Sequence, residues 1–163
     1  MASSTVDATA DETGQEYDSL RYTAGALVGG VVGTALVTAA FAATSTLYGP
    51  DLSVYETLAD LAGVATSDAV GFALFVGAGV VAWPLVFAAL GPYLPGESAV
   101  VRGVVFATAL WSGFLAGFAA DYAGTDLLVF LVFSGLSHLA YGALLGLFGS
   151  RATGGTAPPR PEV

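Results

Sequence analysis

The side chain best suited to chemistry in this sequence is His138, the single histidine among 163 residues. Ser134 lies four residues before it and Tyr141 three residues after it, so the three side chains would share one face of a helix. An imidazole between two hydroxyl groups can exchange hydrogen bonds, carry a proton or bind a metal through a ring nitrogen. Residues 127–150 around His138 include no charged side chain. Any such chemistry would therefore take place in apolar surroundings.

Several interpretations of His138 remain open. A neutral His138 can form a hydrogen bond between helices, which is a common contact in membrane proteins. It can also be an axial haem ligand, although ligation by two histidines would then need a second copy or a partner subunit, because the chain has one. It can gate protons, but a proton relay normally includes Asp or Glu within the same apolar segments, and those segments contain none. Finally, it can contact a small ligand such as a quinone, in a pocket with Trp111.

Polar residues of a second apolar segment are expected at the same depth as His138. The possible polar site at this depth consists of His138, Ser134, Tyr141, Trp111, Thr108 and Ser112. The sequence has no cysteine, no phosphate-binding glycine loop, no cluster of metal ligands and no evident pair of nucleophile and base. We therefore expect no catalytic residues, no metal site and no cofactor, and predict that the protein is not an enzyme.

The distribution of charge defines the elements that must position these residues. Hydrophobic residues make up 55% of the chain and charged residues only 10%, whereas soluble domains carry about 25% charged residues. Four stretches contain no charged side chain at all, namely residues 22–50, 69–96, 103–120 and 127–150. A helix crosses the hydrocarbon core with about 20 apolar residues. The sequence thus predicts an all-α, polytopic membrane protein with four transmembrane helices in a bundle.

The predicted four-helix transmembrane domain covers residues 20–149. Its spans are expected at about 22–48, 69–90, 99–120 and 127–148. The tails, residues 1–19 and 150–163, are rich in small and polar residues and are predicted to be disordered.

Two further features are expected, one between the first two spans and one within the second span. Ser53 and Glu56 have the spacing of a capping box, and the apolar residues that follow recur at helical spacing up to Gly63. This predicts a short amphipathic helix between the first two spans, which either lies in the membrane interface or packs on the bundle. Pro84 lies within the second span and is expected to kink the helix near residues 80–84.

Small residues at four-residue spacing indicate how the spans pack. Glycines in such rows let helix backbones approach closely within a membrane. The rows are Gly25, Gly29 and Gly33; Gly113 and Gly117; and Gly142 and Gly146. The same pattern would serve packing within the chain and packing in a homo-oligomer.

The few cations predict an orientation. The net charge is −9, and the four cationic residues are all arginines. Four spans put both termini on the same side of the membrane, and all four arginines fall on that side, namely Arg21, Arg102, Arg151 and Arg160. The charged residues of the two loops on the other side are all acidic. The positive-inside rule then places both termini in the cytoplasm and the protein in the plasma membrane. The negative charge argues against nucleic acid as a partner, and acidic segments without lysine are typical of halophiles.

Two segments of the sequence resemble a known family. One is Gly-Pro-Tyr-Leu-Pro-Gly at 91–96, followed by Arg-Gly-Val-Val-Phe-Ala at 102–107 and by Trp111. The other is Ser-His-Leu-Ala-Tyr-Gly-Ala-Leu-Leu-Gly at 137–146, which contains a His-x-x-Tyr-Gly-x-x-x-Gly pattern. Together they resemble an uncharacterised family of small four-helix integral membrane proteins, common in haloarchaea and known as a domain of unknown function. The resemblance covers residues 20–149 and implies an archaeal plasma membrane and a four-helix fold, but no activity.

These observations lead to one functional expectation and two alternatives. We expect an integral membrane protein without a catalytic site that acts as a structural or accessory subunit of a membrane assembly. Its partners would be the lipid bilayer and either further copies of the chain or other membrane subunits. The alternatives are a small oligomeric transporter or channel subunit, and a quinone- or haem-binding respiratory subunit that uses His138.

Overall fold

The protein is a bundle of helices, described here by a computed structural model for residues 3–48, 54–64 and 67–155. The longer helices are α1 (Ser3–Tyr48), α2 (Val54–Leu61), α3 (Asp68–Gly77), α4 (Trp83–Leu90), α5 (Ala99–Phe118) and α6 (Gly124–Ala152). Three short elements link them, namely the π-helical turn η1 (Ala78–Ala82) and the 3-10 turns η2 (Gly91–Tyr93) and η3 (Ala119–Asp121). The described residues include no strand, and four helices are long and apolar enough to cross a membrane. The predicted fold class is confirmed.

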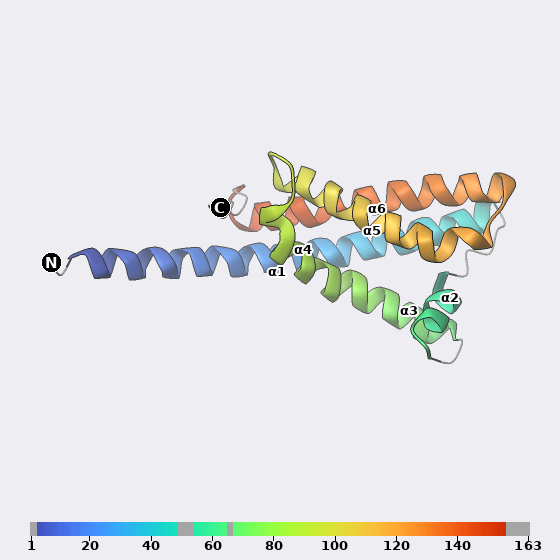
Figure 1. The fold of residues 1–163 in the computed structure, drawn as a ribbon, viewed down its shortest axis with the longest axis horizontal. Helices are drawn as coiled ribbons and strands as arrows, with labels where there is room; N and C mark the ends of the chain where they lie inside the picture. Colours follow the sequence, from blue (N-terminus) through green and yellow to red (C-terminus); the bar gives the residue numbers. More distant parts are fainter. Residues whose placement is uncertain (1–2, 49–53, 65–66, 156–163) are drawn as a thin grey trace.

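The four spans are arranged around a central pair of helices (Figure 1). Helix α6 packs along both α1 and α5, while the second span, formed by α3, η1 and α4, packs on α1. Over the described residues, the second span and α5 have no comparable interface. The second span diverges from α5 towards the end of the bundle where α2 lies (Figure 1). The least buried of the four spans is this second one.

Helix α1 is longer than the predicted span. It begins at Ser3, so it includes most of the segment for which the sequence predicted disorder, and Figure 1 shows this part projecting beyond the bundle. Extending an existing helix adds one hydrogen bond per residue without a new nucleation step, which favours continuation from the span. At the other terminus, α6 continues to Ala152. Residues 156–163 of the predicted C-terminal tail lie outside the described residues.

The second span is distorted just before Pro84, where the sequence predicted a kink. Here the backbone forms the π-helical turn η1, and the amide of Trp83 donates to the carbonyl of Ala78, five residues earlier. Proline has no amide hydrogen and its ring crowds the preceding turn. One turn of wider helix accommodates the ring, and such turns leave backbone carbonyls without a partner in the helix.

The first glycine row serves packing within the chain. A Cβ atom at Gly25 would collide with the backbone of α6 at Phe148, and one at Gly29 would collide with the backbone at Leu144. At Gly33 the nearest group is the ring of Tyr141. The row therefore lies along α6, which explains the long interface between α1 and α6.

A second close approach joins α5 to α6. Gly103 and Gly142 face each other, and a Cβ atom on either would meet the carbonyl of the other; Gly146 lies in the same interface. Gly113 and Gly117, for which we expected a similar role, are placed differently. A Cβ atom at Gly113 would have no neighbour within 4 Å, and one at Gly117 would touch only Leu61 of α2, at 3.5 Å.

Helix α2 ends at Leu61, and Gly63 terminates it, as predicted. Gly63 has a φ of 70°, and the amides of Gly63 and Val64 donate to the carbonyls of Asp60 and Ala59. This pair of bonds is a Schellman motif, which needs a left-handed residue at the glycine position. The other half of the prediction, the capping box at Ser53, lies outside the described residues. Helix α2 packs on α3, where the ring of Tyr55 makes edge contacts with Phe72 and Phe75.

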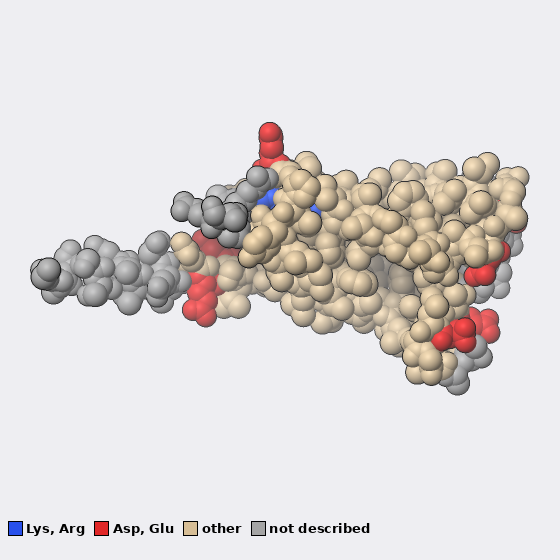
Figure 2. Space-filling view, viewed as in Figure 1, with Lys and Arg blue, Asp and Glu red and all other residues tan. Residues whose placement is uncertain are grey.

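The arginines lie together at one end of the bundle. Figure 2 shows cationic groups where α5 begins and α6 ends, and acidic groups both there and at the end near α2. Arg102 is buried, and its Nε donates to the carbonyl of Gly96 at 3.1 Å. We name this the arginine end, defined by Arg21, Arg102 and Arg151, and name the opposite end the α2 end. Arg160 lies outside the described residues.

Candidate functional site

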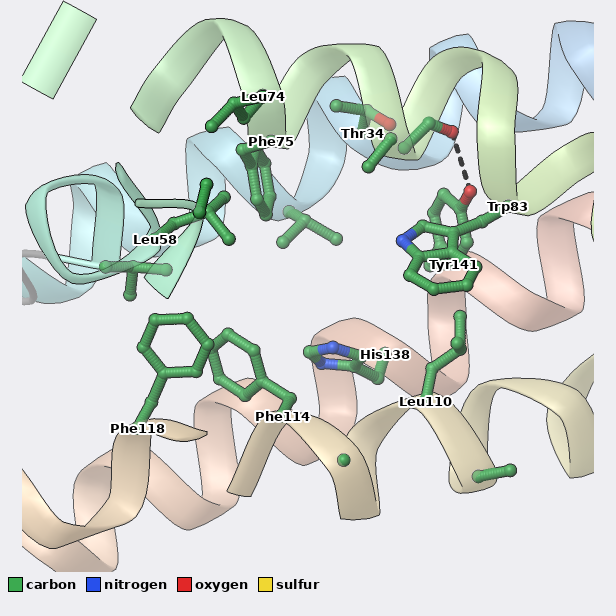
Figure 3. A pocket seen from close by; sticks show the side chains of 17 residues that line it. Thr34, Leu58, Leu74, Phe75, Trp83, Leu110, Phe114, Phe118, His138 and Tyr141 are labelled. Atoms are coloured by element: carbon green, nitrogen blue, oxygen red, sulfur yellow. Dashed lines mark hydrogen bonds between the residues drawn. The ribbon is translucent and has the colours of Figure 1, made fainter. Parts of the chain in front are cut away.

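A cavity of about 540 Å³ lies between the second span and α5. Figure 3 shows residues of the second span and residues of α5 facing each other across it. Its lining is mostly aliphatic and aromatic and comes from all four spans and α2. The lining residues are Thr34, Val37, Val54, Leu58, Ala62, Leu74, Phe75, Ala78, Gly79, Trp83, Ala109, Leu110, Gly113, Phe114, Phe118, His138 and Tyr141.

The cavity results from the divergence of the second span from α5. At the arginine end the two are joined by the rings of Phe87 and Phe106, whose centroids are 5.5 Å apart. Towards the α2 end they separate, and Val54 and Leu58 of α2 line that end of the cavity. Helices α1 and α6 form the back. Over the described residues no interface joins the second span to α5 along this part of the bundle, so this side of the cavity is not closed by packed helices.

A hydrogen bond between spans fixes one end of the cavity. The hydroxyl of Tyr141 donates to the carbonyl of Gly79 at 2.6 Å (Figure 3). In a regular α-helix this carbonyl would accept from the amide of Trp83, but that amide bonds to Ala78 in the π-helical turn. The next possible donor in a π-helical pattern is residue 84, a proline without an amide hydrogen. Tyr141 thus satisfies a carbonyl that its own helix leaves without a donor.

Thr34 has unused hydrogen-bonding capacity at the same end. Its side chain is only 5% exposed, and its Oγ1 has no hydrogen-bond partner among the described residues. It faces Gly79, where a Cβ atom would collide with Oγ1. A buried hydroxyl without a partner costs about 1–3 kcal/mol. Oγ1 has almost no accessible surface and packs against Gly79, so it is not reached from the cavity.

The side chain of His138 lines the cavity. Its Nδ1 lies 2.8 Å from the carbonyl oxygen of Ser134, and because a carbonyl only accepts, Nδ1 carries the hydrogen. In the neutral ring Nε2 is then a bare acceptor, and it has no hydrogen-bond partner among the described residues. The ring packs against Phe114, with centroids 4.9 Å apart, which holds its orientation.

Trp83 adds a donor to this end of the cavity. Its side chain lines the cavity, as does that of Tyr141. The indole Nε1–H is a donor only, and no described residue accepts from it. Together, Trp83, Thr34 and His138 form what we call the polar end of the cavity.

The structure separates the polar residues singled out in the sequence. His138 and Tyr141 line the cavity. Ser134 is fully buried beside it, where its hydroxyl accepts from the indole Nε1 of Trp111 at 3.0 Å. This bond ties α5 to α6 and turns Trp111 away from the cavity.

Thr108 and Ser112 lie on the exposed side of α5. Their hydroxyls donate to carbonyls of their own helix, those of Val104 and Thr108. A hydroxyl that bonds to its own helix needs no partner from a neighbouring span. Neither residue reaches His138.

The sequence did not reveal that Trp83, Thr34 and the carbonyl of Gly79 belong to one site. The available signal was Pro84 itself. A proline within a span leaves a carbonyl four or five residues earlier without a donor, and that carbonyl requires a hydroxyl from another helix.

Among the described residues, no three His, Cys, Asp or Glu side chains are grouped as metal ligands. No curated protein and no solved structure matches the chain. The model of a family of unknown function, DUF6789, matches residues 20–159, a range that includes all four spans and the whole cavity. The chain therefore belongs to the DUF6789 family.

Proposed function

We propose that this protein is a non-enzymatic accessory protein of the plasma membrane that holds a lipid-soluble molecule in its lateral cavity. The observation that carries the proposal is the cavity itself, with about 540 Å³ of space between the second span and α5. Binding sites for small molecules typically have volumes of about 300–1,000 Å³ and are lined mainly by apolar and aromatic side chains with few polar groups. This cavity has that size and that lining.

The position of the cavity supports a ligand that comes from the bilayer. The second span and α5, which line it with residues such as Leu74 and Leu110, would both face lipid. A molecule dissolved in the hydrocarbon phase can enter there without crossing a polar surface. Its apolar part would contact aliphatic and aromatic groups on α3 and α5, and dispersion contacts with such groups stabilise packing in a membrane.

The orientation in the membrane is part of the proposal. Arg102 lies near the start of α5 and Arg151 in the last turn of α6, and Arg21 lies in α1 one turn before Gly25, which packs against the end of α6. By the positive-inside rule, this end would be cytoplasmic. The α2 end, with acidic residues such as Asp60 and Asp121, would then face outward. The cavity extends from the polar end towards α2, so it would occupy the outer half of the membrane.

An accessory role also requires a second protein or a further copy of the chain. Large apolar side chains are exposed on α1 and α6, including Val28, Val32, Val132 and Leu136. These surfaces can contact lipid or the apolar spans of another subunit. Mild detergent purification followed by protein mass spectrometry tests this part, and a solitary monomer without any partner would argue against it.

Whether a ligand occupies the cavity is tested by filling the cavity with a large side chain. A Gly113→Trp variant places a large side chain on the cavity wall, where a Cβ atom meets nothing within 4 Å. Gly77→Trp is the matched control, because Gly77 is also in a span with open space around it but does not line the cavity. Wild type and both variants are purified in mild detergent, and extracted small molecules are quantified by mass spectrometry.

We expect one lipid-soluble molecule to be enriched with wild type and with Gly77→Trp and to be lost from Gly113→Trp. Two results would contradict the proposal. One is that wild type carries no molecule enriched over the detergent extract of the same membranes. The other is that Gly113→Trp, purified as a folded protein, retains the molecule at the wild-type level.

A further inference from the structure

We infer that the ligand is a lipid of the bilayer, whose hydrocarbon chain lies in the cavity with the chain terminus at the membrane midplane and the head group at the α2 end. This inference rests on the proposed function and specifies the chemical class of the ligand and its direction. Three observations carry it. They are the depth that the cavity covers, the position of α2 and the absence of charge from the cavity walls.

The cavity covers one half of the thickness of the membrane. Along α5 its lining extends from Ala109, near the middle of the span Ala99–Asp121, to Phe118. His138, which also lines the cavity, is at the middle of the span Gly124–Ala152. From Ala109 to Phe118 the helix advances nine residues, or about 14 Å, and half of a hydrocarbon core is about 15 Å thick. The cavity is therefore about as long as the chain region of one leaflet.

Helix α2 lies at the end of the cavity that is remote from the midplane. Val54 and Leu58 line the cavity, whereas Glu56 and Asp60 are exposed on the other side of the same helix. A short helix with one apolar and one acidic face is stable where hydrocarbon meets water. The α2 end of the cavity is thus at the depth where a lipid carries its head group.

The walls of the cavity determine the direction of the lipid. No Asp, Glu, Lys or Arg is among the residues that line it. The hydroxyl of Tyr141, which lies near the midplane, already bonds to the carbonyl of Gly79. A charged head group at this depth would lose its hydration without meeting an opposite charge, which is strongly unfavourable. The head group therefore remains at the α2 end, and the chain points towards the midplane.

Aromatic side chains form much of the wall nearest α2. Phe114 and Phe118 stack on each other with ring centroids 4.5 Å apart. Phe75 lies across the cavity from them, on the second span (Figure 3). A chain between these rings would have apolar contacts on two sides, and many such weak contacts sum to an appreciable attraction.

The inference is tested with two photoreactive lipids that differ only in where they react. Both are phosphatidylcholines with one diazirine, placed close to the head group in the first and at the chain terminus in the second. Each is mixed into phosphatidylcholine vesicles that contain the full-length protein, and the adducts are mapped by peptide mass spectrometry. We expect the chain-terminal probe to label Ala109 and Leu110. The head-proximal probe should instead label Leu58 and Phe118.

Filling the cavity separates a bound lipid from lipid that surrounds the protein. Gly113→Trp places an indole on the cavity wall, so the adducts on Leu58 and Leu110 should be lost. Adducts on Leu136, which is exposed on α6, should persist in the same sample. Gly77→Trp leaves the cavity free and should retain wild-type labelling at all three positions.

The outcomes distinguish the inference from the proposed function. The exchanged pattern, with the head-proximal probe on Leu110 and the chain-terminal probe on Leu58, would show a molecule that enters head first and would overturn the inference alone. Labelling that does not depend on probe position, or that persists in folded Gly113→Trp, would overturn it too.

Absence of cavity adducts has two meanings, which co-purification separates. If neither probe labels the cavity but another lipid-soluble molecule co-purifies with the protein, the inference fails and the proposed function stands. If no molecule co-purifies either, both fail. The two probes are compared on wild type, so the inference remains falsifiable even where a variant does not fold.

Discussion

The hydroxyl of Tyr141 in α6 donates to the carbonyl of Gly79 in the second span at 2.6 Å, although the two residues are 62 positions apart in the chain. The bond is required because the π-helical turn and Pro84 together deprive this carbonyl of a donor in its own helix. It also holds the second span at a fixed height against α6, just where that span begins to diverge from α5. The polar end of the cavity therefore depends on this contact.

Removing the hydroxyl should destabilise the protein. We expect Tyr141→Phe to lower the free energy of unfolding by about 1 kcal/mol, because a buried carbonyl loses its donor. Unfolding by SDS, followed by circular dichroism, measures the change. Tyr93→Phe is the control, since Tyr93 is 71% exposed, and an equal loss in both variants would contradict the explanation.

The same contact predicts coupling between Tyr141 and Pro84. Alanine at position 84 restores an amide hydrogen to the helix, so the carbonyl of Gly79 regains a donor of its own. Tyr141→Phe should then cost less in a Pro84→Ala background than in wild type, by about 0.5 kcal/mol or more. A double-mutant cycle of unfolding free energies measures this difference, and strict additivity would show that the two residues are not linked through Gly79.

The contact between Gly103 and Gly142 should not tolerate a methyl group. Gly103→Ala would force a Cβ atom against the carbonyl of Gly142, and since backbone cannot move aside locally, α5 and α6 must separate. We expect a loss of about 1–3 kcal/mol in unfolding free energy. Gly113→Ala, in open space on the same helix, should be as stable as wild type or more so, and the reverse order of stabilities would refute this packing.

The end of α2 should depend on the backbone conformation of Gly63. Its φ of 70° is unfavourable for residues with a Cβ atom, so Gly63→Ala should destabilise the last turn of α2 by about 1 kcal/mol. Hydrogen exchange at the amide of Val64, which bonds to Ala59, should become faster. Gly77→Ala, at a helical φ of −60°, should leave that exchange rate unchanged; if both variants behave alike, the left-handed conformation is not what matters.

The proposed orientation can be measured without removing any native thiol, because the chain has no cysteine. In intact cells, an impermeant maleimide should label Asp60→Cys at the α2 end. It should not label Glu97→Cys at the arginine end until the membrane is permeabilised. Both residues are exposed, so access differs only by side. The opposite labelling pattern would show that the protein has the inverse orientation in the membrane.

Sequence patterning predicted those features that depend on local physical chemistry. The absence of charge over four long stretches indicated the spans, since a charged side chain in hydrocarbon is costly. The end of α2 at Gly63 and the distortion before Pro84 were also predictable, because each follows from the backbone chemistry of one residue. The row from Gly25 to Gly33 indicated a close helix contact, and the structure identifies α6 as its partner.

The cavity could not be predicted from the sequence, because it depends on the angle between two spans. His138 was singled out by its type, but whether it faced another helix or a cavity depends on how the second span and α5 diverge. The pairing of Trp111 with Ser134 rather than with His138 depends likewise on helix rotation, as does the outward position of Thr108. A helical period assigns residues to faces, but it does not say which faces meet.

The central claim is that a lipid-soluble molecule occupies the cavity between the second span and α5. The most direct test is photocrosslinking in native membranes with a farnesol analogue that carries a diazirine, followed by peptide mapping. We predict adducts on cavity residues such as Leu74, Leu110 and Phe114, and their loss in Gly113→Trp. Adducts confined to outward-facing residues such as Val132 and Leu136, or adducts that persist in Gly113→Trp, would contradict the claim.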